Sequence, residues 1–180
     1  ETLVIDENGI QSKIWSGARS AHAMCVFEQI YFARPDSILN GELAYETRQR
    51  LGAEVFREHP VDADIVVGIP DSSTPHAVGL AAAAKIPYAE AIIRNRYVGR
   101  TFIQPDQRSR EQGVQTKFNP MRGVIEGKRL LVVDDSIVRS TTITRVIKML
   151  RRAGAKEIHV RVASPPIKST CHFGVDMATL

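Results

Sequence analysis

Apolar residues follow two different spacings along this chain, and segments with the two spacings alternate. Short segments rich in apolar residues are predicted to be strands at 63–69, 88–93, 128–133 and 157–163, the first of them of the buried type. Apolar residues spaced by three or four positions predict helices over 42–58 and 141–155, and a further helix follows a loop at 70–74. This alternation favours an α/β fold whose mostly parallel, twisted sheet carries helices on both faces.

The predicted helices also carry recognisable boundary residues. Pro60 stands just beyond the first helix, Pro75 lies at an early position of the second, and Gly154 is expected to end the third. The predicted buried faces are Leu43, Thr47, Leu51 and Val55 in the first helix and Ile143, Val146, Ile147 and Leu150 in the third.

Two adjacent aspartates, Asp134 and Asp135, follow one of the buried strands at what we expect to be an exposed strand end. Parallel strands end at the same edge of a sheet, so the loop at 70–74 and the stretch 134–142 are expected to face one crevice. Backbone N–H groups of 136–142 lead into a helix N-terminus, which favours a phosphate. Carboxylates accept hydrogen bonds from sugar hydroxyls and attract Mg²⁺, so the pattern indicates a sugar phosphate. The alternative is that the two aspartates only cap a turn.

Composition narrows the class of protein. A chain of 180 residues with 43% apolar content suits one domain with a sizeable core, and the net charge is +4. The stretch 94–117 holds six basic and two acidic residues, which accounts for that excess. We therefore expect a small polyanion, or a solvated loop, and no nucleic acid. No apolar run is long enough to span a membrane, and two cysteines far apart fit a reducing, cytoplasmic compartment. The start at Glu1 and the lack of a closing element suggest a piece of a longer protein.

Two other phosphate-related motifs fail on closer reading. Residues 123–129 look like part of a Walker loop, but they lack the Ser or Thr after the lysine and precede a strand. The "LLVVDDS" stretch also resembles a receiver domain of two-component signalling. That domain needs a later core aspartate, whereas Asp176 is the sole aspartate after Asp135 and lies near the chain end.

The "VVDDSIVRSTT" stretch resembles the phosphoribosyl pyrophosphate (PRPP) loop of type I phosphoribosyltransferases. Four further stretches, "FEQIYFARPDS", "GIPDSSTPHAVG", "RNRYVGRTFIQP" and "SPPI", are similar to the glutamine PRPP amidotransferase family. The resemblance implies the type I phosphoribosyltransferase fold. It also implies that residues 23–180 form a phosphoribosyltransferase domain truncated at its C-terminus. Residues 1–22 would then be a linker and the tail of a missing glutaminase domain.

The resemblance assigns roles at the site. Asp134 and Asp135 would hold the ribose hydroxyls, and Mg²⁺ would contact them and Ser72. The PRPP loop is Asp134, Asp135, Ser136, Ile137, Val138, Arg139, Ser140, Thr141 and Thr142. The pyrophosphate loop contains Asp71, Ser72 and Ser73, although helix capping explains these residues equally well. The family commonly has glycine where this chain has Ser140, which would strain the loop if that position needs a positive φ.

Residues 94–118 would form a lid that closes over PRPP, with Arg94, Arg96, Tyr97, Arg100 and Thr101 near the pyrophosphate. The implied reaction is attack of ammonia on C1 of PRPP, with loss of pyrophosphate. No GxSxG motif or Cys/His arrangement is present, and the five histidines fit surface or packing positions. The alternatives are a salvage phosphoribosyltransferase for a nucleobase and a regulator that binds PRPP without chemistry.

The implied partners are PRPP, pyrophosphate, ammonia, the glutaminase domain of the full-length chain, purine nucleotide inhibitors and further copies in a homo-oligomer. Some members of the resembled family carry a [4Fe-4S] cluster on four cysteines. Cys25 and Cys171 match two of those positions. We expect the cluster only in a full-length protein, because four thiolates are the usual set. The alternative is that both are inert thiols.

Overall fold

The computed structural model describes residues 2–13, 24–95, 118–138, 140–169 and 171. Its first elements are small. Strands β1 (Thr2–Asp6) and β2 (Gly9–Lys13) form an antiparallel hairpin, which the sequence patterns did not predict. The short π-helix η1 (Glu28–Phe32) follows, and then β3 (Ile38–Leu39) and β4 (Glu42–Leu43) pair with each other.

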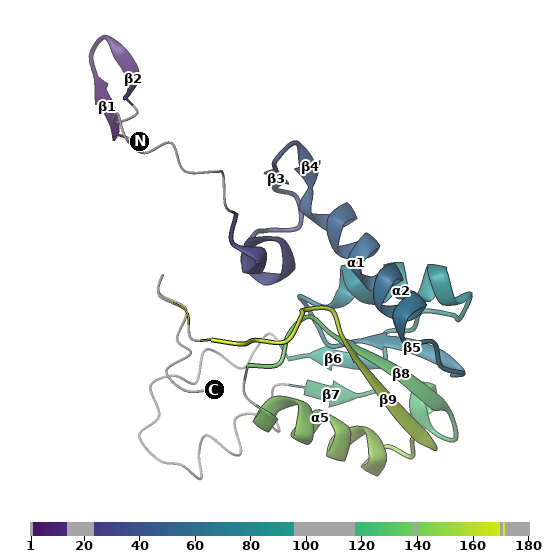
Figure 1. Cartoon of the computed structure of the whole chain (residues 1–180). Helices are drawn as coiled ribbons and strands as arrows, with labels where there is room; N and C mark the ends of the chain where they lie inside the picture. The colour runs from purple at the N-terminus through teal and green to yellow at the C-terminus, as the bar shows by residue number, and fades with distance from the viewer. Residues whose placement is uncertain (1, 14–23, 96–117, 139, 170, 172–180) are drawn as a thin grey trace.

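The central sheet is parallel, as predicted. Strands β5 (Ile65–Gly68), β8 (Arg129–Asp134) and β9 (Glu157–Val162) lie in the order β5-β8-β9, so β8 is the middle strand (Figure 1). Ile65 pairs with Leu130, which sets the two strand ends level at Gly68 and Val133. The C-terminal ends of β5 and β8 therefore reach the same edge of the sheet.

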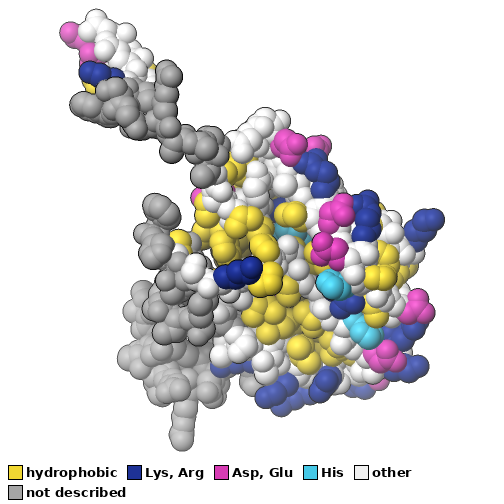
Figure 2. Space-filling model, in the orientation of Figure 1, with side chains coloured by type: hydrophobic (Ala, Val, Ile, Leu, Met, Phe, Trp, Pro, Cys, Tyr) yellow, Lys and Arg dark blue, Asp and Glu magenta, His cyan; other side chains and the backbone are white. Residues whose placement is uncertain are grey.

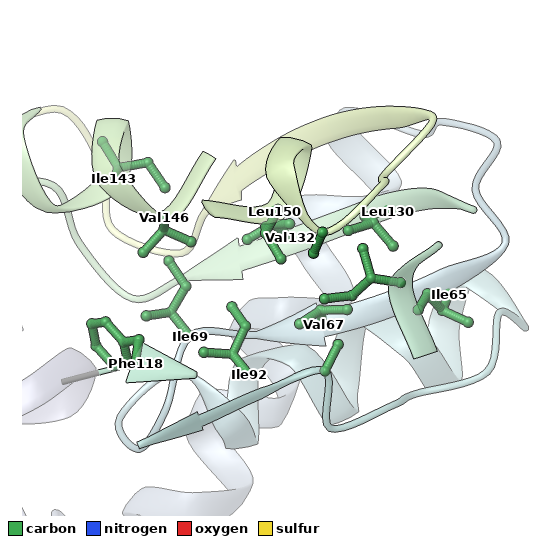
Figure 3. Close-up of a cluster of buried hydrophobic side chains, with 13 residues drawn as sticks. Ile65, Val67, Ile69, Ile92, Phe118, Leu130, Val132, Ile143, Val146 and Leu150 are labelled. Atoms are coloured by element: carbon green, nitrogen blue, oxygen red, sulfur yellow. The ribbon is translucent and has the colours of Figure 1, made fainter. Parts of the chain in front are cut away.

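Helices cover both faces of this sheet. Helices α1 (Ala44–Glu58) and α2 (Thr74–Ala84) lie on one face, and α5 (Ser140–Arg152) lies on the other (Figure 1). Alternate residues of β5 and β8 enter two separate apolar clusters, as the period of two in a strand requires. The cluster under α5 contains Ile65, Val67, Ile69, Leu130, Val132, Ile143, Val146 and Leu150 (Figure 3). Val66, Leu131 and Val133 instead pack against α2.

The buried face of α1 differs from the prediction. Leu51 and Val55 are only half-buried, whereas Ala44, Arg48 and Gly52 are fully buried. The stripe is shifted by one residue because α1 packs closely on α2 through glycine. A Cβ at Gly52 would overlap the carbonyl oxygen of His76, and a Cβ at Gly79 would overlap the carbonyl oxygen of Gln49. Apolar periodicity does not register a contact made by glycine.

The predicted strand at 88–93 is divided in the structure. Tyr88 forms one parallel bridge with Val66, at the edge of the central sheet. Strand β6 (Ile92–Arg94) leaves this sheet and pairs antiparallel with β7 (Phe118–Pro120), which is followed by the short helix α4 (Arg122–Ile125). The segment predicted as one strand therefore contributes to two sheets. Its second part, β6, extends toward the edge where β5 and β8 end.

Helix α5 ends as predicted, with Gly154 at a φ of 95°, a conformation that favours glycine. Its sequence contains no acidic residue, and its last turn is basic. In the view of Figure 2, Lys and Arg side chains gather along the lower edge of the molecule, where α5 lies. Lys148, Arg151 and Arg152 of α5 are exposed, and Arg145 is half-buried.

Candidate active site

A cleft of about 830 Å³ opens at the edge where β5 and β8 end. Several segments far apart in the sequence line it. Phe27, Tyr31 and Phe32 come from the η1 region, and Ile69 to Ser72 follow β5. The end of β8 and the residues after it contribute 134–138, with Thr142 and Ile143 of α5, and Arg94 of β6 and Phe118 of β7 complete the lining. The sequence prediction that 70–74 and 134–142 face one crevice is therefore confirmed, whereas the three aromatic side chains had no predicted role in the site.

Ser73 joins the two predicted loops. Its hydroxyl accepts the backbone N–H of Asp135 (3.0 Å) and donates to Oδ1 of Asp134 (3.1 Å). The Ser73 Oγ to Asp135 Oδ2 distance is 3.5 Å. Both carboxylates therefore converge on one hydroxyl, although alternate side chains of a strand point to opposite faces. They converge because β8 ends at Asp134, which frees the next residue from the strand geometry.

The two aspartates lie in different environments. We expected both at an exposed strand end, but Asp135 is only 4% exposed and Asp134 is half-buried. Asp135 accepts the hydroxyl of Ser136 (2.7 Å) on Oδ1. Burial, together with the neighbouring Asp135 carboxylate, raises the pKa of Asp134 to about 6. Two carboxylates are thus held close together near neutral pH, an arrangement that favours a cation or a ligand with several hydroxyl groups.

The stretch predicted to bind a phosphate leads directly into α5. Helix α5 begins at Ser140, so Ser140, Thr141 and Thr142 form its first turn, where backbone N–H groups lack partners within the helix. Helical residues have a negative φ, so Ser140 adopts a conformation that serine tolerates and the strain we considered does not arise in this state. Ile137 and Val138 also line the cleft, and Arg139 lies outside the described residues.

The other end of the cleft carries an exposed ion pair. Arg94, at the end of β6, donates from Nη1 to Oδ2 of Asp71 (2.9 Å), and both side chains are about half exposed (43% and 53%). The peptide bond between Pro70 and Asp71 is cis. Ser72 lines the same cleft. The remaining predicted lid residues, Arg96, Tyr97, Arg100 and Thr101, lie outside the described part of the chain.

The donor set at this edge fits Mg²⁺ better than a transition metal. Asp134, Asp135 and Ser72 offer only oxygen, and the described residues hold no group of three or more His, Cys, Asp or Glu side chains that could enclose a metal. Mg²⁺ is commonly bound by one or two carboxylates together with the phosphates of a substrate. Oδ2 of Asp134 accepts no hydrogen bond from the described residues, so this atom is available for such a contact.

The sequence profile of the phosphoribosyl transferase domain matches residues 35–165, which include both loops and both carboxylates of the cleft. The chain belongs to this domain family. Its fold, a parallel sheet with helices on both faces, is the type I phosphoribosyltransferase fold predicted from the sequence.

Proteins closely similar to this chain are named amidophosphoribosyltransferase. The chain is 50% identical to the amidophosphoribosyltransferase of Synechococcus elongatus over 99% of its own length and 36% of that protein. It is 51% identical to the amidophosphoribosyltransferase of Pyrococcus horikoshii, again over 99% of this chain and 39% of the relative. The chain thus spans less than two fifths of the length of these relatives.

Solved structures agree with the sequence relatives. One neighbour, described as the allosteric regulatory enzyme of purine biosynthesis, has a TM-score of 0.86 and 50% identity over 98% of this chain and 38% of its own. Another is the glutamine PRPP amidotransferase of Bacillus subtilis in complex with ADP and GMP. It has the same TM-score and identity, and 39% of that chain is covered.

Two buried polar residues behind the cleft were missed by the sequence analysis. Arg48 of α1 is 1% exposed and His76 of α2 is fully buried. Burial lowers the pKa of His76 to about 4; the Asp135 carboxylate opposes this shift and the Arg48 guanidinium adds to it. Burial also lowers the pKa of Arg48, again opposed by Asp135. One sequence pattern could have indicated that Arg48 is buried. Ala44, Arg48 and Gly52 are spaced i, i+4, i+8, which places the arginine on the same helix face as two small residues.

The cysteines are described only in part. Cys25 is exposed and Cys171 is half-buried. Their predicted role as two ligands of a [4Fe-4S] cluster stays a prediction, since most of the chain around Cys171 lies outside the described residues.

Among the described residues, no helix is long and apolar enough to cross a membrane.

Proposed function

We propose that this phosphoribosyl transferase domain catalyses ammonia-dependent transfer from PRPP, the first committed step of purine synthesis. The nitrogen of ammonia forms a bond to C1 of PRPP, the bond from C1 to the pyrophosphate oxygen breaks, and one proton is released to give 5-phosphoribosylamine. The observation that carries the proposal is the convergence of Asp134 and Asp135 on Ser73, with Asp135 five residues before the start of α5 and both aspartates in the same cleft.

Each part of the cleft has a place in this reaction. The first turn of α5 and the backbone of 136–138 would bind the 5-phosphate through N–H groups. Asp134 and Asp135 would accept hydrogen bonds from the two ribose hydroxyls, which fixes the sugar with C1 toward the loop 70–73. Arg94, held nearby by Asp71, would exchange that partner for the pyrophosphate group.

Mg²⁺ would be held by Asp134 and Ser72 with the substrate, and it would stabilise the negative charge that develops on the leaving pyrophosphate. In a full-length enzyme, a glutaminase domain would supply the ammonia. The Bacillus subtilis neighbour binds ADP and GMP, which favours purine nucleotides as competitors for the phosphate subsites. We further propose a cytoplasmic homo-oligomer.

Pyrophosphate release from Mg-PRPP tests the proposal. Ammonium chloride at alkaline pH should support release by the purified chain, whereas adenine, guanine, hypoxanthine and uracil should not. Release with a nucleobase alone would identify a salvage enzyme. Tight PRPP binding without any release would identify a regulator. Glutamine should not replace ammonia in this chain, and glutamine hydrolysis would contradict that expectation.

A further inference from the structure

Arg48 makes all of its described hydrogen bonds to backbone carbonyl groups of a single segment. Its Nε donates to the carbonyl oxygen of Gln29 (2.7 Å) and its Nη2 to that of Ala33 (2.7 Å), with Glu28 at the limit of 3.5 Å. These groups belong to η1 and the residue that ends it. A guanidinium group can bridge two such acceptors because its N–H donors are fixed in a planar fork.

The segment that Arg48 holds provides one wall of the cleft. Phe27, Tyr31 and Phe32 line it together with the carboxylates, and Tyr31 and Phe32 are 49% and 47% exposed. Their rings contact one another, with centroids 6.1 Å apart for Phe27 and Phe32 and 5.6 Å for Tyr31 and Phe32. We call these three residues the aromatic wall. Ile30 is the one fully buried side chain of η1, so the wall is anchored by this residue and by the hydrogen bonds to Arg48 of α1.

We propose that Arg48 is a positioning residue that fixes the aromatic wall against the PRPP site and thereby excludes water from the reacting carbon. The charge of Arg48 has no ion-pair partner within 4.0 Å among the described residues, so the side chain gains little from direct charge pairing there. Burying a guanidinium without an ion-pair partner is costly, and its hydrogen bonds to the carbonyl groups of Gln29 and Ala33 offset part of that cost.

The placement of Arg48 also links the wall to the carboxylates. Arg48 lies one turn before Gly52, whose Cα faces the backbone of His76 in α2, and α2 begins directly after Ser73. The wall, α1, α2 and the hydroxyl that binds both aspartates therefore form one packed series. The wall lines the same cleft as Asp134 and Asp135, so its movement away from α1 would open that cleft.

The test compares Arg48→Lys and Arg48→Met with the wild-type chain, with Arg50→Lys as the matched control. Arg50 lies on the same helix and forms an exposed ion pair with Glu42. Lysine keeps the charge but lacks the planar fork whose separate nitrogens reach the carbonyl groups of Gln29 and Ala33. We expect amides 31–33 to exchange hydrogen about tenfold faster in Arg48→Lys, with strand β8 unchanged and Arg50→Lys like wild type. Equal protection of 31–33 in Arg48→Lys and wild type would overturn the inference, and this measurement needs no activity.

The second arm rests on the proposed function. The ratio of pyrophosphate released without ammonia to that released with ammonia should rise about tenfold in Arg48→Lys, because water gains access to C1. A purely structural defect would lower both rates together and leave the ratio unchanged, which would overturn the positioning role. If the wild-type chain releases no pyrophosphate under any condition, the proposed function fails, while the exchange result still decides whether Arg48 holds the wall. If Arg48→Met does not fold, the comparison of Arg48→Lys with the wild-type chain alone decides the test.

Discussion

Ser73 and Asp135 lie 62 positions apart in the sequence, yet the Ser73 hydroxyl accepts the backbone N–H of Asp135 at 3.0 Å. This contact connects the start of α2 with the end of β8. The same hydroxyl donates to Asp134, so a single small side chain orients both carboxylates of the site. A serine that could be taken for a simple helix cap thus joins the two loops.

Replacement of Ser73 by alanine should affect both stability and ligand binding. The Asp135 N–H would keep only its bond to Oδ1 of Asp134 (3.0 Å), and Asp134 would lose a donor, so we expect a loss of about 1–2 kcal/mol in the free energy of unfolding. The loss in free energy of PRPP binding should be larger than the loss in free energy of unfolding, because neither carboxylate is then oriented by the Ser73 hydroxyl. Urea denaturation and calorimetric titration with Mg-PRPP measure the two effects. Ser164→Ala is the control, since its hydroxyl makes no hydrogen bond among the described residues. Unchanged PRPP affinity in Ser73→Ala would contradict the orienting role.

Asp134→Asn should stabilise the ligand-free protein at neutral pH while weakening PRPP binding. The pKa of Asp134 is raised to about 6, so between its ordinary value near 4 and pH 6 the folded state binds more protons than the unfolded state. The stability contributed by this group therefore falls as pH rises through that window. We expect Asp134→Asn to exceed wild type by about 1–3 kcal/mol at pH 7, and the difference to vanish near pH 4.

The difference between the two proteins is the relevant measurement, because other carboxylates change stability in the opposite sense. Salt bridges lower the pKa of Asp64 and of Glu126, and both residues are present in wild type and variant. Urea midpoints at several pH values between 4 and 8 give the comparison. A constant difference across this range would show that Asp134 does not titrate there.

Asp135→Asn should have the opposite effect on stability. Asp135 is buried and its charge opposes the cost of burying Arg48, whereas Asp134 is destabilised by its neighbour. Removal of the Asp135 charge relieves its repulsion with the half-buried Asp134, but it leaves the fully buried guanidinium with less compensation. We expect the second effect to prevail, at a net cost on the order of 1–2 kcal/mol. Thermal unfolding at pH 7 ranks Asp134→Asn above wild type and Asp135→Asn below it. The same sign for both variants would refute this assignment.

The sequence allowed the main fold and the location of the cleft to be predicted, because these depend on local patterns. Residues 130–133 are continuously apolar, since both faces of β8 are covered, and the position of "DDS" after this strand placed the carboxylates at the sheet edge. The burial of Asp135 was not predicted, because it depends on Ser73 and on the exact end of β8. Arg48 was missed for a related reason: a basic residue in an amphipathic helix is normally assigned to its exposed face.

The close contact between α1 and α2 yields the last prediction. A Cβ at Gly79 would overlap the backbone carbonyl of Gln49, and backbone atoms cannot move aside as a flexible side chain can. The helices must separate, so Gly79→Ala should destabilise the chain by about 2 kcal/mol or more, despite the better helix propensity of alanine. Gly123→Ala is the control. Gly123 is exposed in α4 with no atom within 4 Å of an added Cβ, so the change should be neutral or slightly stabilising. Because α2 starts at the residue after Ser73, Gly79→Ala should also weaken Mg-PRPP binding, which titration of the folded variant at low temperature measures. Unfolding free energies equal to wild type in both alanine variants would show that the helices do not depend on this glycine contact.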